Sequence, residues 1–167
     1  VAGLVPGAHE GKGRGNQFLS DLSRADVLIH VVDASGSTNE KGEPVPAGSH
    51  DPCGDIVFLE EEIDYWFVGI LEKNWGKVSK WPVSDKRQLL EKLAQTLSGV
   101  GANETSIEKT LHKSGLMEKK LEQWNATDKK EFCTKLREIT KPIVIAANKM
   151  DIPTAEKNLQ KMKEKFP

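Results

Sequence analysis

Two short apolar segments, separated by most of the chain, dominate its hydrophobic pattern. Val27 to Asp33 reads Val-Leu-Ile-His-Val-Val-Asp, and Ile143 to Ala147 reads Ile-Val-Ile-Ala-Ala. Each is short, rich in β-branched residues and apolar almost throughout, which is typical of strands buried on both faces of a parallel sheet. Pro142 is compatible with the second strand only at its first residue. The pattern predicts an α/β fold with parallel strands.

Between the two strands the pattern changes to that of helices. From Asp55, apolar residues such as Ile56, Leu59 and Ile63 recur every three or four positions, with acidic residues between them. A last helix, rich in lysine, is predicted to begin at Pro153-Thr154. The other predicted helices each have a residue suited to cap the first turn: Ser84, Asn103 and Thr127.

The segment Ala34 to Gly54 is rich in Gly, Pro, Ser, Asn and Asp and predicts a long loop. A loop of this length is uncommon inside a compact domain, so we expect it to lead into a separate lobe. The predicted organisation is one α/β domain made of residues 1–54 and 141–167, interrupted by a helical lobe over residues 55–140. Tryptophans at positions 75, 81 and 124 are interpreted as packing anchors of that lobe.

Composition excludes several classes of protein. Lys and Arg number 24 against 25 Asp and Glu, so net charge gives no general attraction to nucleic acid or anionic lipid. No apolar run approaches the ~20 residues of a membrane helix. The two cysteines form no Cys-x-x-Cys pair, which suits a reducing cytoplasm and predicts neither disulfide nor zinc site. His50 and Cys53 are spaced so that a metal is conceivable, but a loop is the preferred interpretation.

The chain's most specific chemistry follows the second strand, where Asn148-Lys149-Met150-Asp151 resembles the base-specificity motif Asn-Lys-x-Asp of GTPases. A carboxylate accepts two hydrogen bonds from guanine, whereas adenine offers an acceptor at the matching ring nitrogen and lacks the amine. The resemblance implies that Asp151 selects guanine over adenine, that Asn148 contacts the base and braces neighbouring loops, and that the stem of Lys149 covers the base plane. In doubly wound folds, ligands bind at this end of the strands.

A glycine ladder opens the chain, from Gly3 through Gly15, and leads into a predicted helix from Asn16 to Arg24. Glycines permit positive φ and leave backbone N–H groups free to rearrange around a phosphate. The run from Leu4 to Leu19 resembles the second switch of Obg-related GTPases, which implies that the Gly3 amide meets the γ-phosphate. A flexible glycine-rich turn before a helix is the alternative.

Four stretches sharpen this resemblance to the archaeal-type branch of YchF GTPases, in the Obg superfamily: the first strand, the long loop, Phe58 to Trp66, and Lys141 to Lys149. The resemblance covers almost the entire chain. It implies a partial P-loop GTPase (G) domain with an inserted helical, coiled-coil-like lobe, binding of GTP and Mg²⁺, slow hydrolysis, and association with the ribosome or its RNA. The phosphate loop and other G-domain parts are not in the sequence, so we expect the chain alone to be inactive.

Several points leave alternatives open. Leu4 stands where Ras-like GTPases carry the glutamine that orients water, so hydrolysis would need another group, a bound K⁺ or a partner. His9 is not assigned that role, and no catalytic or metal-binding residue is assigned. Some YchF proteins prefer ATP, although the retained Asp151 favours GTP. A non-enzymatic helical RNA-binding or adaptor module is a further alternative, supported by Lys119-Lys120, Lys129-Lys130 and the terminal lysines. The oligomeric state stays open.

Overall fold

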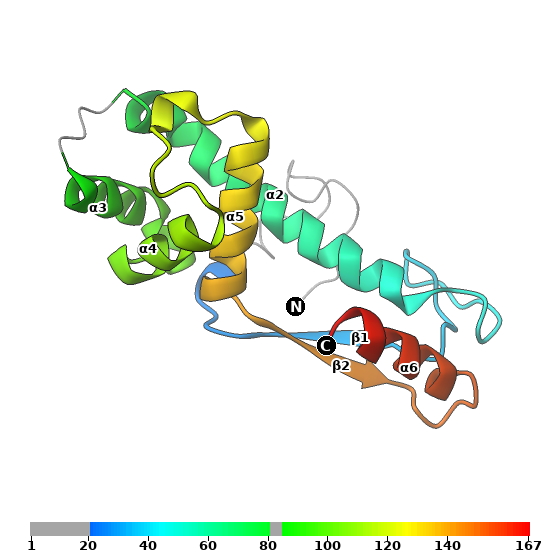
Figure 1. Ribbon diagram of the computed structural model, residues 1–167. Helices are drawn as coiled ribbons and strands as arrows, with labels where there is room; N and C mark the ends of the chain where they lie inside the picture. The colour runs from blue at the N-terminus through cyan, green and yellow to red at the C-terminus, as the bar shows by residue number, and fades with distance from the viewer. Residues whose placement is uncertain (1–20, 81–84) are drawn as a thin grey trace. The chain divides into compact units, whose positions relative to one another are not determined.

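The computed structural model describes residues 21–80 and 85–167 (Figure 1). Gly3, Leu4, His9, the glycine ladder, Trp81 and Ser84 therefore lie outside the described residues. The described elements are β1 (Leu28–Asp33), α2 (Pro52–Val78), α3 (Lys86–Leu97), α4 (Glu104–Lys113), α5 (Ala126–Thr140), β2 (Ile143–Asn148) and α6 (Ala155–Lys165), with short 3-10 helices at Ser98–Val100 and Leu121–Gln123.

These residues form two compact units, which we call the helical unit (residues 21–28 and 62–142) and the αβ unit (residues 29–61 and 143–167). The division falls within helix α2, between Glu61 and Glu62. The segments expected from the sequence, 1–54, 55–140 and 141–167, remain a prediction, because compact units do not say which part is inserted into which.

Strands β1 and β2 are neighbours in a parallel sheet. The N–H of Leu28 donates to the carbonyl of Pro142 at 2.9 Å, and the N–H of Ala34 donates to the carbonyl of Asn148 at 3.0 Å. The acceptor thus advances along β2 in the same direction as the donor along β1. Parallel strands need a long crossover connection, which residues 34–142 supply. The predicted α/β fold class is confirmed.

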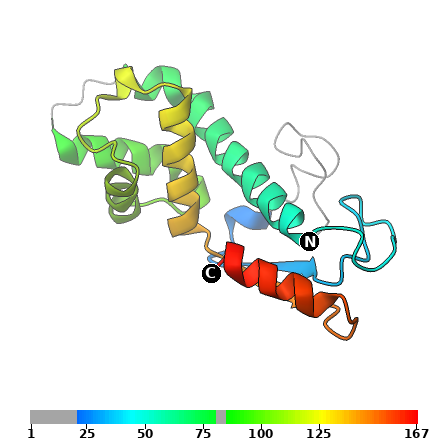
Figure 2. The ribbon, with the colours of Figure 1, turned by 45° about the vertical axis from the view of Figure 1, so that its right-hand side comes forward.

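The core of the αβ unit lies on one face of the strands. Two helices, α6 and the first part of α2, pack on that face (Figures 1 and 2). The buried members of this cluster are Val32, Ala34, Cys53, Ile56, Ala155 and Met162. On the opposite face Ile29 is 71% exposed and Val31 is 61% exposed. The prediction that β1 is buried on both faces is therefore wrong for this chain, since both packing helices cover the same side.

The helical unit is held together by the apolar stripes of its helices. Its largest fully buried side chains come from every long helix of the unit: Ile63, Phe67, Leu71, Leu93, Leu97, Ile107, Leu111, Phe132 and Leu136. Trp75 stacks on Trp124 with ring centroids 5.6 Å apart, and Trp124 meets Phe132 at 5.1 Å. These contacts agree with the interpretation of Trp75 and Trp124 as packing anchors.

Helix starts differ in detail from the predictions. Asn103 caps α4 as expected, in a capping box with Ser106. Helix α5 is capped by Asn125, whose side chain accepts from the Asp128 N–H at 2.9 Å, so the predicted cap at Thr127 is wrong. Asp85 provides the side-chain cap of α3.

Helix α2 begins earlier than its apolar pattern, at Pro52 rather than Asp55. Proline is favoured in the first turn because its missing N–H would have no partner there. None of the helices within residues 21–80 and 85–167 combines the length and apolar character needed to cross a membrane.

One lysine of each pair in the helical unit, Lys119 and Lys129, has its charge matched by a carboxylate of the same unit. Lys129 is buried, pairs with Glu72 at 2.9 Å and lies 4.3 Å above the ring of Trp75. Lys119 pairs with Asp128 at 2.7 Å. The interpretation of these two lysines as part of an RNA-facing patch is therefore not supported, because their charges are already matched within the unit.

Candidate functional site

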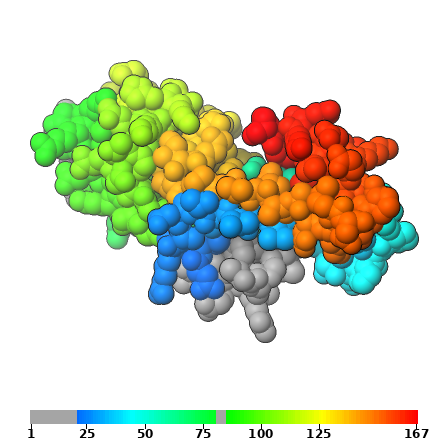
Figure 3. All heavy atoms as spheres, turned by 90° about the horizontal axis from the view of Figure 1, so that it is seen from below, coloured from blue at the N-terminus to red at the C-terminus, as the bar shows by residue number. Residues whose placement is uncertain are grey.

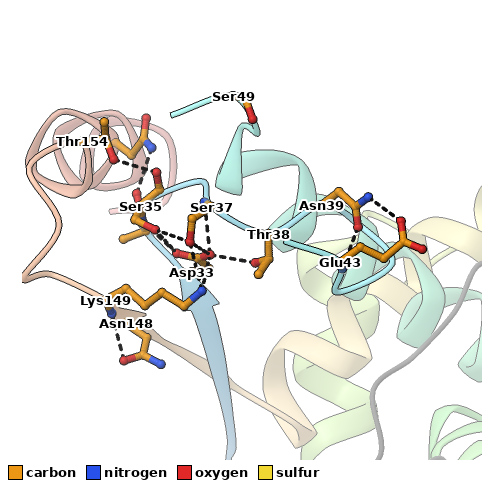
Figure 4. Close-up of polar contacts among 12 residues, drawn as sticks. Asp33, Ser35, Ser37, Thr38, Asn39, Glu43, Ser49, Asn148, Lys149 and Thr154 are labelled. Atoms are coloured by element: carbon orange, nitrogen blue, oxygen red, sulfur yellow. Dashed lines mark hydrogen bonds and ion pairs between the residues drawn. The ribbon is translucent and has the colours of Figure 1, made fainter. Parts of the chain in front are cut away.

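The candidate site lies where the two parallel strands end, and its centre is the Asp33 side chain (Figure 4). Asp33 is the last residue of β1, and the chain turns sharply after it. Its Oδ1 accepts from the Ser35 N–H at 3.0 Å, and its Oδ2 accepts from the Ser37 N–H at 3.2 Å. The Thr38 hydroxyl donates to Oδ2 at 2.7 Å. Aspartate commonly stabilises turns in this way, by accepting from backbone groups a few residues ahead.

Lys149, the second residue of the Asn-Lys-x-Asp motif, reaches across to this turn. Its Nζ donates to Asp33 Oδ2 at 2.9 Å and contacts Ser37 Oγ at 3.0 Å (Figure 4). The loop after β1 and the loop after β2 thus meet at one end of the αβ unit (Figure 3). They meet because parallel strands end at the same edge of the sheet.

The Asp33 carboxylate is stabilised as an anion. Burial acts to raise its pKa, but hydrogen bonds from Ser35, Lys149, Thr38 and Ser37 outweigh burial and hold the pKa well below its usual value. At neutral pH the contact with Lys149 is therefore a charge-assisted hydrogen bond, which is stronger than a neutral one.

The backbone of Lys149 adopts φ = 60°, in the left-handed region that side chains other than glycine seldom occupy. The N–H of Lys149 donates to Asn148 Oδ1 at 2.9 Å, and its carbonyl accepts from the Ile152 N–H at 3.2 Å. This tight turn leaves Asn148 and Asp151 exposed, and the Lys149 side chain is 37% exposed. The structure thus brings three of the predicted site residues onto one loop; Gly3 lies outside the described residues.

Two further contacts fasten the loop after β1 to helix α6. The Thr154 hydroxyl donates to the Ser35 carbonyl at 2.8 Å, and the buried Asn158 amide donates to the Ala34 carbonyl at 2.8 Å. Thr154 occupies the N-cap position of α6 but makes no capping bond, because its hydroxyl is used here. Both loops of the site are therefore tied to the same helix.

Sequence reasoning missed the polar side chains of the β1 turn: Asp33, Ser35, Ser37 and Thr38. A signal was present, since an apolar strand that ends in Asp-x-Ser-x-Ser-Thr joins a strand terminus to turn-forming residues. The partner of Asp33 is far away in sequence, so the pattern alone did not identify Lys149.

His50 and Cys53 do not share a site. His50 Nε2 lies 2.8 Å from Asp55 Oδ1, whereas Cys53 is buried in the core of the αβ unit. Burial, together with nearby Asp51, raises the pKa of the Cys53 thiol, so it is a poor metal ligand. Residues 21–80 and 85–167 hold no group of three or more His, Cys, Asp or Glu side chains placed to bind a metal ion.

Comparison with known proteins shows extensive similarity to GTP-binding proteins. The chain is 45% identical over 99% of its length to an uncharacterised GTP-binding protein of Methanocaldococcus jannaschii, of which it covers 41%. It is 38% identical over 99% of its length to an uncharacterised GTP-binding protein of Schizosaccharomyces pombe, of which it covers 40%. The chain therefore spans about two fifths of the length of these relatives.

A more distant similarity links the chain to Obg, a GTPase. The Obg GTPase of Rhizorhabdus wittichii is 32% identical over 62% of the chain, which covers 26% of that protein. A crystal structure of a GTP-binding protein from Pyrococcus horikoshii is 40% identical, with a TM-score of 0.76 over 89% of this chain and 43% of that one. No family model matches the chain. Together these relatives support a place among Obg-like GTPases without distinguishing the YchF branch.

Proposed function

We propose that this chain is the central part of a GTP-binding protein of the Obg-like GTPases, and that the full-length protein binds GTP and hydrolyses it slowly. One observation carries the proposal: the chain is similar along nearly its whole length to proteins described as GTP-binding. The geometry adds support, because Asn148-Lys149-Met150-Asp151 lies at the carboxyl end of a parallel strand, where such folds bind ligands.

Within this proposal the exposed loop after β2 recognises the guanine base. The Asp151 carboxylate can only accept hydrogen bonds, so it suits the two donors that guanine presents and adenine lacks. Asn148 braces the loop through its bond to the Lys149 N–H, and the stem of Lys149 forms an apolar surface for the base plane. The Gly3 amide contacts the γ-phosphate, as the resemblance to the second switch implies.

Metal ions enter the proposal only through the resemblance. GTPases use Mg²⁺ to neutralise phosphate charge. Residues 21–80 and 85–167 hold no group of three or more His, Cys, Asp or Glu side chains placed to bind a metal ion, so none of them is assigned to Mg²⁺ or to a K⁺ that substitutes for the missing glutamine at Leu4.

The finer assignment is a YchF-type protein of the cytoplasm in which residues 55–140 are a helical insertion that contacts the ribosome. The test is deletion of residues 62–140 from the full-length protein, which leaves the first part of α2 in the αβ core, followed by co-sedimentation with ribosomes. The proposal expects GTP binding to persist and co-sedimentation to be lost. Sedimentation that survives the deletion would assign the contact to another part of the protein.

Guanine selectivity is tested by competition binding on the full-length protein. Asp151→Asn is expected to weaken GTP binding by about 10²- to 10⁴-fold, because two charge-assisted hydrogen bonds of ~1.5–3 kcal/mol each are lost. The same variant should favour xanthosine triphosphate, since the new amide donates to the 2-oxo group. Asp26→Asn, at an exposed aspartate before β1, is the matched control and should bind GTP normally. If ATP displaces GTP equally well from the unaltered protein, the assignment of guanine fails and an ATP-preferring NTPase takes its place.

A further inference from the structure

We propose that Asp33 is a positioning residue for nucleotide recognition, which acts by holding Lys149 in place and does not itself contact the base. The inference rests on the proposed function, since it concerns the same loop. It adds a residue outside the Asn-Lys-x-Asp motif, on a different strand, to the determinants of nucleotide affinity.

The first step concerns the Lys149 side chain. A lysine side chain is long and flexible, and ordering it on binding costs conformational entropy. Here Nζ is already held at 2.9 Å by Asp33 Oδ2 and at 3.0 Å by Ser37 Oγ. The stem is therefore fixed before any nucleotide arrives, and a group ordered in advance lowers the cost of binding.

The second step concerns the Lys149 backbone. A φ of 60° at a residue other than glycine persists only where the surroundings hold it. The ion pair to Asp33 joins this turn to the loop after the other strand, together with the contact between Lys149 Nζ and Ser37 Oγ. It thereby helps to maintain the conformation in which Asn148 and Asp151 are exposed.

The third step concerns the chemistry of Asp33. Its Oδ2 is shared by donors from Ser37, Thr38 and Lys149. Asparagine has nearly the same size but one acceptor oxygen and an NH₂ group, so Asp33→Asn would set a donor against either the Lys149 ammonium or the Ser35 N–H. The variant removes the ion pair with little change in volume.

The experiment compares nucleotide dissociation constants in the full-length protein. Asp33→Asn should weaken GTP binding by about ten- to a hundredfold, which is the loss expected for one charge-assisted hydrogen bond. Inosine triphosphate lacks the 2-amine that Asp151 recognises. Its binding should weaken by the same factor in the variant, because Lys149 covers the base plane of both nucleotides. Glu40→Gln removes an exposed carboxylate from the same loop and should leave both constants unchanged.

A double-variant cycle separates positioning from general stabilisation. In a Lys149→Met background, adding Asp33→Asn should cause no further loss of GTP affinity, because the ammonium group that Asp33 holds is already absent. Ser37→Ala removes the second contact to Nζ, together with the bonds of the Ser37 hydroxyl to Asp33 Oδ2 and Ser35 Oγ, and the part of its loss that acts through Lys149 should be smaller and should disappear in that background. It keeps the test decisive should Asp33→Asn fail to fold.

Three results would overturn the proposal: unchanged GTP affinity in Asp33→Asn, losses that add fully to those of Lys149→Met, or a loss confined to GTP and absent with inosine triphosphate. A protein that binds ATP as tightly as GTP would refute the proposed guanine selectivity instead. The cycle would then be measured with ATP and would still decide whether Asp33 acts through Lys149.

Discussion

Removing the buried carboxylate of Asp64 should destabilise the helical unit strongly. Asp64 accepts from Arg137 Nε at 2.9 Å and from the Thr134 hydroxyl at 2.8 Å, and both members of the ion pair have only 7% of their side-chain surface exposed. Asp64→Ala therefore takes the carboxylate away from a guanidinium that stays buried. Breaking a buried pair at one partner typically costs about 3–5 kcal/mol, because the remaining charge loses an interaction that offset its desolvation.

Amide hydrogen exchange of helix α5 is the suitable assay, because it reports local opening and does not require the full-length protein to unfold in one step. A loss of ~3–5 kcal/mol corresponds to exchange about 10²- to 10⁴-fold faster in this helix. Glu108→Gln is the control. It breaks the exposed pair with Lys86 in the same unit, and exchange in α5 should not change.

A second variant tests the reason for the effect. Asp64→Leu combined with Arg137→Met replaces both charges by apolar side chains, which is often neutral or stabilising for buried pairs. Exchange should therefore return most of the way to that of the unaltered protein. The reasoning is refuted if Asp64→Ala leaves exchange within about threefold of the starting value, or if the double variant is as unstable as the single one.

Two other predictions concern the αβ unit. Burial lowers the pKa of His30 against the opposing effect of Asp55, so the unfolded chain binds a proton at higher pH than the folded one. Stability should therefore fall as the pH drops below about 6.5, and melting curves at pH 7.5 and 5.5 should show a smaller fall for His30→Leu. Gly36 has φ = 62°, and an added Cβ would lie 2.3 Å from the His50 carbonyl oxygen. Gly36→Ala should lower the free energy of unfolding by more than the ~1–3 kcal/mol of backbone strain alone. Gly42→Ala, in open space at φ = 77°, should lower it by that strain only, and thermal melting of the two variants gives the comparison.

Local patterns were enough to identify several parts of this protein. The strands at Val27 to Asp33 and Ile143 to Ala147 were recognised from short apolar runs; in the structure the first begins one residue later, at Leu28, and the second ends one residue later, at Asn148. The cap at Asn103 was identified because a residue suited to cap a helix directly precedes the apolar positions of that helix, and the structure confirms it. The motif at Asn148 to Asp151 was likewise visible in consecutive letters. Each of these features depends on neighbours in the sequence.

Other features depended on contacts between distant residues, and only the tertiary structure decided them. The one-sided burial of β1 depends on α2 and α6 packing on the same face, which no pattern within β1 reveals. Asp33 and Lys149 meet because two parallel strands end at one edge of a sheet, and that register is set by hydrogen bonds between the strands.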